Sequence, residues 1–258
     1  MSVLIMKFGG VSLSNVSKIL QIAEIIIQRK KQFSKIVVIT SAMGKTTNHL
    51  LKLSQRICFN PDKREQDMLI SVGERVAMSL LAMALISKGV SAISFTGSQS
   101  GIITSKEHSD AKIVDIRPKR LLSHLKAGKI VIVAGFQGVS LQGEITTLGR
   151  GGSDTSAVAL AVALGAQKVE FYKDVKGIYN ADPKQDKKAV CFEKLDYDEA
   201  LTFLKDGGKI LHARSVELAK KNQMLLHVLP YFNYDREKGT LIGLGSKREK
   251  SIPIFEQM

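Results

Sequence analysis

The amino-acid sequence predicts an α/β protein with a mostly parallel central sheet and helices packed against it. Short runs rich in β-branched residues alternate along the chain with longer amphipathic stretches of helical spacing. Clusters of glycine fall where the predicted strands end, and no internal repeat or Pro/Ser-rich linker divides the chain. With 258 residues, of which 44% are hydrophobic, the chain is long enough to form one large domain with a full core.

The predicted strands are apolar runs bounded by turn residues, and they span residues 3–8, 35–40, 91–96, 130–134, 168–172 and 225–230. The first predicted helix is capped by Ser14 and runs to about Lys31, because apolar residues recur between them at helical spacing. Further helices are predicted over residues 48–57, 65–87, 118–126, 154–164, 197–205 and 213–222. Residues 97–116 mix polar positions with short β-rich pieces, which predicts a hairpin or a lid over one end of the sheet.

The composition limits the classes of function. A net charge of +14 would suit a nucleic-acid-binding protein, but the lysines are spread along the chain without an aromatic recognition module. We therefore expect a solvated basic surface and no nucleic-acid partner. A basic excess is also compatible with polyanionic ligands such as nucleotides.

The apolar segments and the cysteines indicate the cellular compartment. Uninterrupted apolar runs fall short of the roughly 20 residues that a membrane span needs, and the N-terminus reads as a strand instead of a signal peptide. We expect a cytoplasmic protein with no membrane segment. Cys58 and Cys191 lie far apart without a partner motif, which argues against a disulfide framework or a zinc site and favours two buried side chains.

The first glycine cluster follows the first predicted strand and contains Lys7, Gly9 and Gly10. Paired glycines let backbone N–H groups approach an anion closely, and the preceding lysine adds a mobile positive charge. An anion site and a plain strand-to-helix turn both fit this segment on its own.

The second cluster is the richest in chemistry, because a glycine turn, an arginine and an acid stand within a few residues. Gly149, Gly151 and Gly152 precede an alanine-rich helix, so free amides and the positive end of the helix dipole meet at one place. Arg150 suits bidentate binding of a carboxylate. Asp154 fits either a helix N-cap or an acid that orients a catalytic lysine.

Other segments give weaker signals. The Gly44-Lys45-Thr46 triplet resembles the end of a Walker A loop, but the required earlier glycine is Ile39 inside a strand. The loop of residues 172–184 suits either an adenine and ribose site or a surface turn. Glu74 and Arg75 interrupt an apolar helix, where they face a polar site or form a buried ion pair. The histidines show no metal or triad spacing.

Taken in order, the motifs KFGGVS, VITSAMGKTTN, SVGER, AGFQG, TLGRGGSDTSA, YKDVKGIYNADPK and GGKILHARSVELA resemble the catalytic domain of aspartokinases in the amino-acid kinase superfamily. The resemblance runs from about residue 3 to about residue 243. It implies a three-layer α/β/α sandwich with a catalytic domain over residues 1–246, in which a substrate side extends to about residue 170 and a nucleotide side follows. Residues 247–258 are then a C-terminal tail.

The resemblance also implies a reaction and a set of site residues. The γ-phosphoryl of MgATP passes to the β-carboxylate of L-aspartate, giving 4-phospho-L-aspartate and ADP. The expected catalytic residues are Lys7, Asp154 and Lys209. Aspartate-binding positions are Thr47, Glu74, Phe136, Arg150 and Ser153. Phosphate or ATP positions are Gly9, Gly10, Gly151, Gly152, Lys173, Asp174, Tyr179 and Lys184.

Physical reasoning fits this reaction without the family name. Two anions must meet, so catalysis is mainly positioning and charge neutralisation by lysines and glycine amides. A carboxylate nucleophile is already ionised at neutral pH and needs no general base. Mg²⁺ is expected to bridge phosphates through water instead of occupying a protein cage.

The chain departs from the family pattern in three places. Lys173-Asp174 stands where Thr-Asp is usual, Asp182-Pro183-Lys184 replaces Asp-Pro-Arg, and Ala213 replaces a proline. Aspartokinases commonly continue into ACT regulatory domains and form dimers. We therefore expect a homodimer. Because the sequence ends soon after the expected catalytic domain, we also expect no ACT-mediated feedback. The expected role is in amino-acid biosynthesis, such as that of lysine and threonine. Two rival hypotheses are a kinase for another carboxylate in specialised metabolism and a non-catalytic binding subunit on the same fold.

Overall fold

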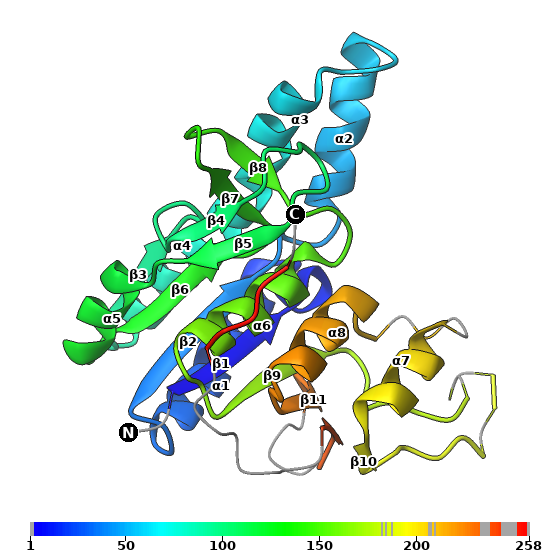
Figure 1. The fold of residues 1–258 in the computed structure, drawn as a ribbon. Helices are drawn as coiled ribbons and strands as arrows, with labels where there is room; N and C mark the ends of the chain where they lie inside the picture. The colour runs from blue at the N-terminus through cyan, green and yellow to red at the C-terminus, as the bar shows by residue number, and fades with distance from the viewer. Residues whose placement is uncertain are drawn as a thin grey trace.

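The computed structural model describes residues 3–181, 183, 185–186, 188–205, 208, 210–232, 238–243 and 252–256. Its centre is an eight-stranded sheet in the order β10-β12-β11-β9-β1-β2-β6-β3 (Figure 1). Every neighbouring pair is parallel except β11 and β12, which confirms the mostly parallel sheet. The strands are β1 (Val3–Phe8), β2 (Lys35–Thr40), β3 (Ala92–Phe95), β6 (Ile130–Ala134), β9 (Lys168–Lys173), β10 (Lys194–Leu195), β11 (Leu226–Pro230) and β12 (Thr240–Ile242).

The sheet is buried on both faces because its strands are apolar at odd and even positions alike. In β1, Val3 and Ile5 pack into the core shared with α6, whereas Leu4, Met6 and Phe8 pack into the core shared with α1 and α4. The helices α5 (Lys119–Lys126), α6 (Gly152–Ala163) and α8 (Ala213–Lys221) cover the first face. The helices α1 (Val16–Lys30) and α4 (Val72–Ser87) cover the second. The predicted three-layer sandwich is confirmed.

Two helix predictions need correction. The cap of α1 is Asn15 instead of Ser14, since the Asn15 side chain accepts a hydrogen bond from the Lys18 N–H. The stretch predicted as one helix is two, α3 (Lys63–Ile70) and α4, divided at Ser71. The Ser71 carbonyl accepts a 2.8 Å hydrogen bond from the Gln137 side chain, which lies far along the sequence, so the local apolar pattern gives no sign of the break. The helices α2 (Thr46–Ile57) and α7 (Tyr197–Lys205) lie where predicted.

A second, four-stranded sheet stands at one end of the main sheet, beside α2 and α3 (Figure 1). Its order is β5 (Ile113–Ile116), β4 (Ile102–Thr104), β7 (Gln137–Ser140) and β8 (Ile145–Thr147). The antiparallel pair of β4 and β5 confirms the predicted hairpin. The pair of β7 and β8 was not predicted, because polar and glycine residues hide its alternation.

Residues 252–256 cross the α6 side of the molecule as an extended strap, drawn red in Figure 1. The Asn222 side chain bonds both the N–H and the carbonyl of Ile254. Glu256 bonds the backbone N–H of Ile113 and also pairs with the guanidinium of Arg214. The same guanidinium donates to the Leu148 carbonyl, 2.7 Å away. Part of the predicted tail is therefore tied to the chain that leads into the second glycine cluster.

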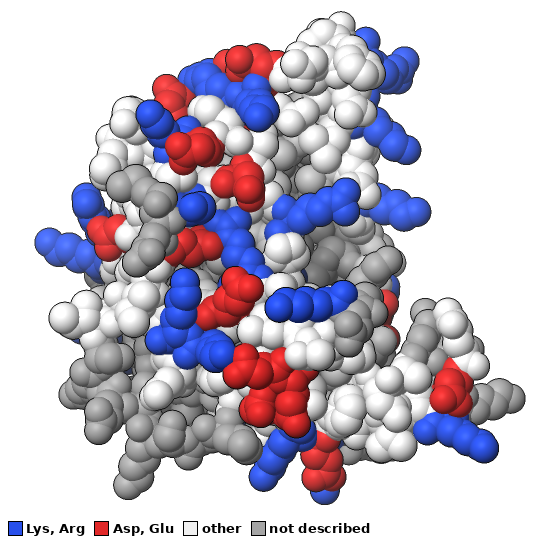
Figure 2. All heavy atoms as spheres, turned by 45° about the vertical axis from the view of Figure 1, so that its right-hand side comes forward, with Lys and Arg blue, Asp and Glu red and all other residues white. Residues whose placement is uncertain are grey.

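The surface and the apolar helices bear on the expected partners. On the face in Figure 2, Lys and Arg side chains are interspersed with Asp and Glu, as a solvated basic surface requires. By length and composition the stretch Lys63–Ser87 is apolar enough to cross a membrane, and 56% of its most apolar window is buried inside the protein. Core helices of globular proteins meet the same criterion. Cys58 is exposed at the end of α2 and Cys191 is half-buried, so the prediction of two buried cysteines is wrong.

Candidate active site

Two lysines converge on one buried carboxylate at the carboxyl ends of neighbouring parallel strands. The alternation of β1 points Lys7 to the face covered by α6, and Lys173 ends the adjacent strand β9. The Lys7 Nζ lies 2.6 Å from Oδ1 of Asp154 in the first turn of α6. The Lys173 Nζ lies 3.4 Å from Oδ2 of the same carboxylate. Asp154 thus holds both ammonium groups in place.

Burial and charge act against each other in this cluster. Burial alone would raise the pKa of Asp154, but Lys173 and Lys7 outweigh it, so the pKa lies below its ordinary value. Burial lowers the pKa of Lys173 to about 8, with Lys7 adding to the decrease and Asp154 opposing it. With both lysines protonated, the cluster carries one excess positive charge in largely buried surroundings, which attracts an anion.

The second glycine cluster builds the N-terminus of α6. Gly151 is the N-cap with a φ of 73°, so Asp154 is not the cap. A Cβ on Gly151 would lie 2.2 Å from the His212 ring, and one on Gly152 would lie 2.7 Å from the Leu148 Cβ. These close approaches require glycine. The turn therefore presents backbone and the positive end of the helix dipole beside the two lysines.

The first and third glycine clusters pack against each other. The Gly44 N–H donates a 2.8 Å hydrogen bond to the Gly10 carbonyl. A Cβ on Gly10 would lie 2.7 Å from the Ala42 carbonyl oxygen. The segment that contains the Gly44-Lys45-Thr46 triplet thus supports the first loop, and Gly44 itself lines a cavity described below.

Two cavities meet at this cluster. One of about 580 Å³ is lined by all five predicted aspartate positions, by the catalytic candidates Lys7 and Asp154 and by part of the glycine turns: Lys7, Gly10, Thr47, Glu74, Phe136, Arg150, Gly151, Gly152, Ser153 and Asp154. We call it the acid cavity. The other, of about 440 Å³, is lined by Lys7, Gly9, Gly10, Lys173 and Asp174, among others. We call it the nucleotide cavity. Both contain Lys7, so this one ammonium group faces two compartments.

Glu74 resolves an alternative that the sequence leaves open. It is 3% exposed in the first turn of α4, and its Oε1 accepts a 3.0 Å hydrogen bond from the Ala42 N–H. Its Oε2 is buried and has no hydrogen-bond partner among the described residues. Burial raises the pKa of Glu74 to about 7, against the smaller opposing effects of the Ala42 N–H and Lys7. Glu74 therefore faces a polar site and is not the partner of Arg75.

Phe136 is held in a conformation that is uncommon for its residue type. It joins β6 to β7 with a φ of 70°, and its N–H donates to the Ser156 hydroxyl on α6 at 3.1 Å. Strain of this kind persists where the surrounding structure requires it, often at functional sites. Here it brings the aromatic residue to the wall of the acid cavity.

Some predicted positions lie elsewhere, and some wall residues were missed. Tyr179 is half-buried in an isolated bridge with Cys191 and lines neither of the two cavities. Lys184 and Lys209 lie outside the described residues. Gln66, Ile70 and Ser109 line the acid cavity without having been predicted, because they come from a helix and a loop that contain no glycine cluster.

The fold and the paired cavities define a class of protein. Residues 2–230 match the model of the amino acid kinase family. The chain belongs to the amino acid kinase family.

Two relatives with similar sequences belong to one kind of amino acid kinase, the aspartokinases. The aspartokinase of Bacillus sp. (strain MGA3) is 48% identical over 254 residues, which cover 98% of this chain and 61% of that protein. Aspartokinase 2 of Bacillus subtilis (strain 168) is 47% identical, with 98% and 62% covered. The chain thus spans about three-fifths of the length of these relatives.

Solved structures agree with this assignment. Aspartate kinase from Synechocystis matches with a TM-score of 0.86 and 42% identity, over 97% of this chain and 41% of that one. UMP kinase from Bacillus anthracis matches with a TM-score of 0.70 and 19% identity, over 94% of this chain and 96% of that one. The second likeness shows the shared fold alone.

Proposed function

We propose that the chain is the catalytic domain of an aspartate kinase, an ATP-dependent enzyme that phosphorylates the β-carboxylate of L-aspartate to 4-phospho-L-aspartate. The observation that carries the proposal is the position of Lys7, which lines the acid cavity and the nucleotide cavity at once. The aspartokinases among the relatives support the choice of acid. The part of the chain up to about residue 170 then binds the acid and supplies the glycine turns, and the part from about residue 171 completes the nucleotide side.

Each wall residue has a task that its chemistry suits. Arg150 binds the α-carboxylate of the acid, and Glu74 receives its α-ammonium at the unpaired Oε2. The amides of the two glycine turns hold phosphate oxygens. Lys7 and Lys173 stabilise the negative charge on the transferring phosphoryl group, with Asp154 fixing their positions. The reacting carboxylate is ionised at neutral pH, so the site needs no general base.

Magnesium enters this proposal together with the nucleotide. No group of three or more potential metal-ligating side chains occurs in the part of the chain that the structure describes, so the nucleotide phosphates and water would supply most ligands. Asp174 is the exposed carboxylate that lines the nucleotide cavity and would face the ion's water shell. When bound, Mg²⁺ neutralises phosphate charge.

A hydroxylamine trap tests the acceptor directly. An acyl phosphate reacts with hydroxylamine to a hydroxamate, which forms a coloured complex with Fe³⁺. Colour is therefore expected with aspartate, and it should require the protein, ATP and aspartate together. Glutamate and N-acetylglutamate are run in parallel. Hydroxamate from another acid at a higher kcat/KM would overturn the aspartate assignment. No hydroxamate and no ADP with any acid would indicate a binding subunit. The dimeric state and cytoplasmic location stay predictions, and light scattering tests the first.

The pH dependence of kcat/KM for aspartate is expected to be bell-shaped, with a maximum between pH 7 and pH 8. Below about pH 7 Glu74 becomes protonated and no longer attracts the substrate ammonium. Above about pH 8 Lys173 loses the charge that binds phosphate. Each limb should approach a tenfold change per pH unit, and initial rates from pH 5.5 to 9.5 measure both.

Two variants assign the limbs. Glu74→Gln should lower kcat/KM at pH 8 and remove only the acidic limb. Lys173→Arg should shift only the alkaline limb, and shift it to higher pH, because a guanidinium stays charged. Glu24→Gln, an exposed change on α1, is the matched control and should leave the profile intact. An acidic limb that persists in Glu74→Gln contradicts the assignment.

A further inference from the structure

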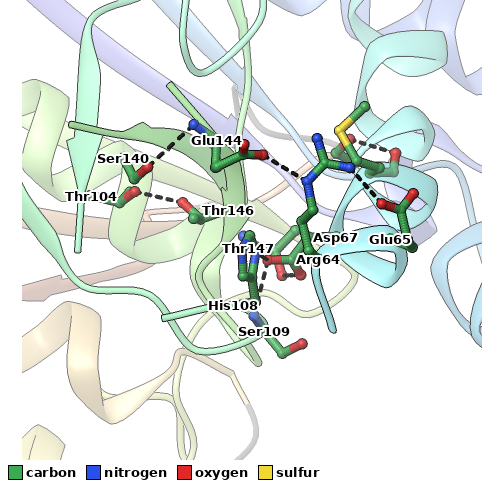
Figure 3. Close-up of polar contacts among 12 residues, drawn as sticks. Arg64, Glu65, Asp67, Thr104, His108, Ser109, Ser140, Glu144, Thr146 and Thr147 are labelled. Atoms are coloured by element: carbon green, nitrogen blue, oxygen red, sulfur yellow. Dashed lines mark hydrogen bonds and ion pairs between the residues drawn. The ribbon is translucent and has the colours of Figure 1, made fainter. Parts of the chain in front are cut away.

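Asp67 is a buried carboxylate on α3 that lies behind the wall of the acid cavity. It is fully buried, and both of its oxygens accept hydrogen bonds (Figure 3). Oδ1 accepts from the Thr147 hydroxyl at 2.6 Å, and Oδ2 accepts from the Thr147 N–H at 3.0 Å. The Ser109 N–H and the His108 Nδ1 also lie 3.0 Å from Oδ2. One side chain thus joins three segments that are far apart in the sequence.

Each of these segments contributes to the acid cavity. Gln66 and Ile70 flank Asp67 on α3 and line the cavity, as do its partners Ser109 and Thr147. Thr147 ends β8 and is followed directly by the turn that carries Arg150. The position of the carboxylate-binding arginine therefore depends on where Asp67 holds the end of β8.

The backbone at Ser109 indicates that this arrangement is imposed by the site. Ser109 has a φ of 70°, in the left-handed region that a residue with a side chain seldom adopts. Its N–H points at the Asp67 carboxylate in that conformation. Such strain persists only where neighbouring contacts fix the backbone. Asp67 supplies that contact.

A buried charge is a poor device for stability alone, because apolar replacements of buried polar groups are often as stable. What a fully hydrogen-bonded carboxylate provides is a fixed geometry. An exposed link between the same elements already exists, since Arg64 on α3 pairs with Glu144 in the β7–β8 turn at 2.8 Å (Figure 3). The two links differ in location: only the Asp67 link lies at the cavity wall.

We propose that Asp67 is a positioning residue for the acid substrate: by fixing Thr147 and Ser109 against α3, it sets the place of Arg150 and thereby the affinity for the acid. This rests on the proposed function of the same site. Asp67 lines neither cavity in the described part of the chain. The proposal therefore concerns KM for the acid and neither ATP binding nor phosphoryl transfer.

The test is Asp67→Asn, which keeps the size of the side chain but removes its charge and one acceptor oxygen. We expect KM for aspartate to rise about 10- to 100-fold, the loss in binding that follows when a hydrogen bond to a charged group is displaced. The kcat should change less than about threefold, and KM for ATP should stay the same. Thr147→Val, which deletes one donor and keeps the shape, should give a smaller rise. Arg64→Ala, the matched exposed control, should leave both constants unchanged.

Hydrogen exchange gives a readout that does not need activity. In Asp67→Asn the amides of Ser109 and Thr147 should exchange faster while those of β1 and β9 stay protected. Unchanged exchange, an unchanged KM for aspartate, or a loss of kcat as large as the rise in KM would each overturn the proposal. If Asp67→Asn does not fold, Thr147→Val decides by the same criteria. A wild-type chain that phosphorylates no acid would refute the proposed function instead. The hydrogen-exchange experiment would still test whether Asp67 fixes Ser109 and Thr147 at the cavity wall.

Discussion

Lys7→Met is expected to lower kcat by about 100- to 1000-fold, the loss that follows removal of one preorganised charge from a transition state. The Lys7 ammonium lies 2.6 Å from Asp154 and borders both cavities, so it is placed to stabilise the phosphoryl group between the two reactants. Methionine preserves most of the buried volume. KM for aspartate and KM for ATP should change less than kcat, because this interaction strengthens in the transition state.

Steady-state and single-turnover rates measure the effect, and circular dichroism with thermal unfolding checks the fold. Asp154 keeps Lys173 as a partner in this variant, which should maintain the folded state. Lys126→Met, an exposed change on α5, is the control and should behave as wild type. A Lys7→Met protein that folds and retains more than a third of the wild-type kcat would refute the mechanism.

Arg150→Ala should raise KM for aspartate about 100-fold or more while leaving KM for ATP nearly unchanged. Arg150 is exposed at the rim of the acid cavity, and among the described residues no carboxylate pairs with it, so its guanidinium is available to the substrate. Charge-assisted bidentate pairs are about twice as strong as neutral hydrogen bonds. For Arg150→Lys, KM for aspartate should lie between those of wild type and Arg150→Ala, since lysine keeps the charge but cannot form the bidentate pair.

Titration of both substrates in initial-rate experiments separates the two KM values. Arg56→Ala, on the exposed side of α2, serves as the control for loss of a positive charge. Should Arg150→Ala bind aspartate as tightly as wild type, Arg150 would not be the carboxylate ligand, and the orientation of the acid in its cavity would have to be reversed.

The strands and the lysine cluster could be predicted from local pattern because their causes are local. The runs that form β1, β2, β6 and β9 are apolar on both faces, as strands buried between two helical layers must be. Period-two alternation alone puts Lys7 on the side of Ile5. Glycines then mark where those strands end, which is where an open parallel sheet binds ligands.

The walls of the acid cavity could not be predicted in this way, because their causes are distant contacts. Asp67 is bonded to Thr147, 80 positions later, yet in the sequence it is one more acidic residue on a polar helix. The division at Ser71 depends on Gln137, 66 positions away. Glu74 could be placed near a site or in an ion pair, and only the fold decides between them.

The acid cavity and the nucleotide cavity have largely separate walls and meet at a small shared boundary. Among their described lining residues they share Lys7 and Gly10, while Arg150 and Glu74 border one side and Lys173 and Asp174 the other. Substitutions that change the shape of the acid cavity therefore need not disturb the nucleotide cavity. A protein with this arrangement can change its specificity for the acceptor acid during evolution and keep the same phosphate donor.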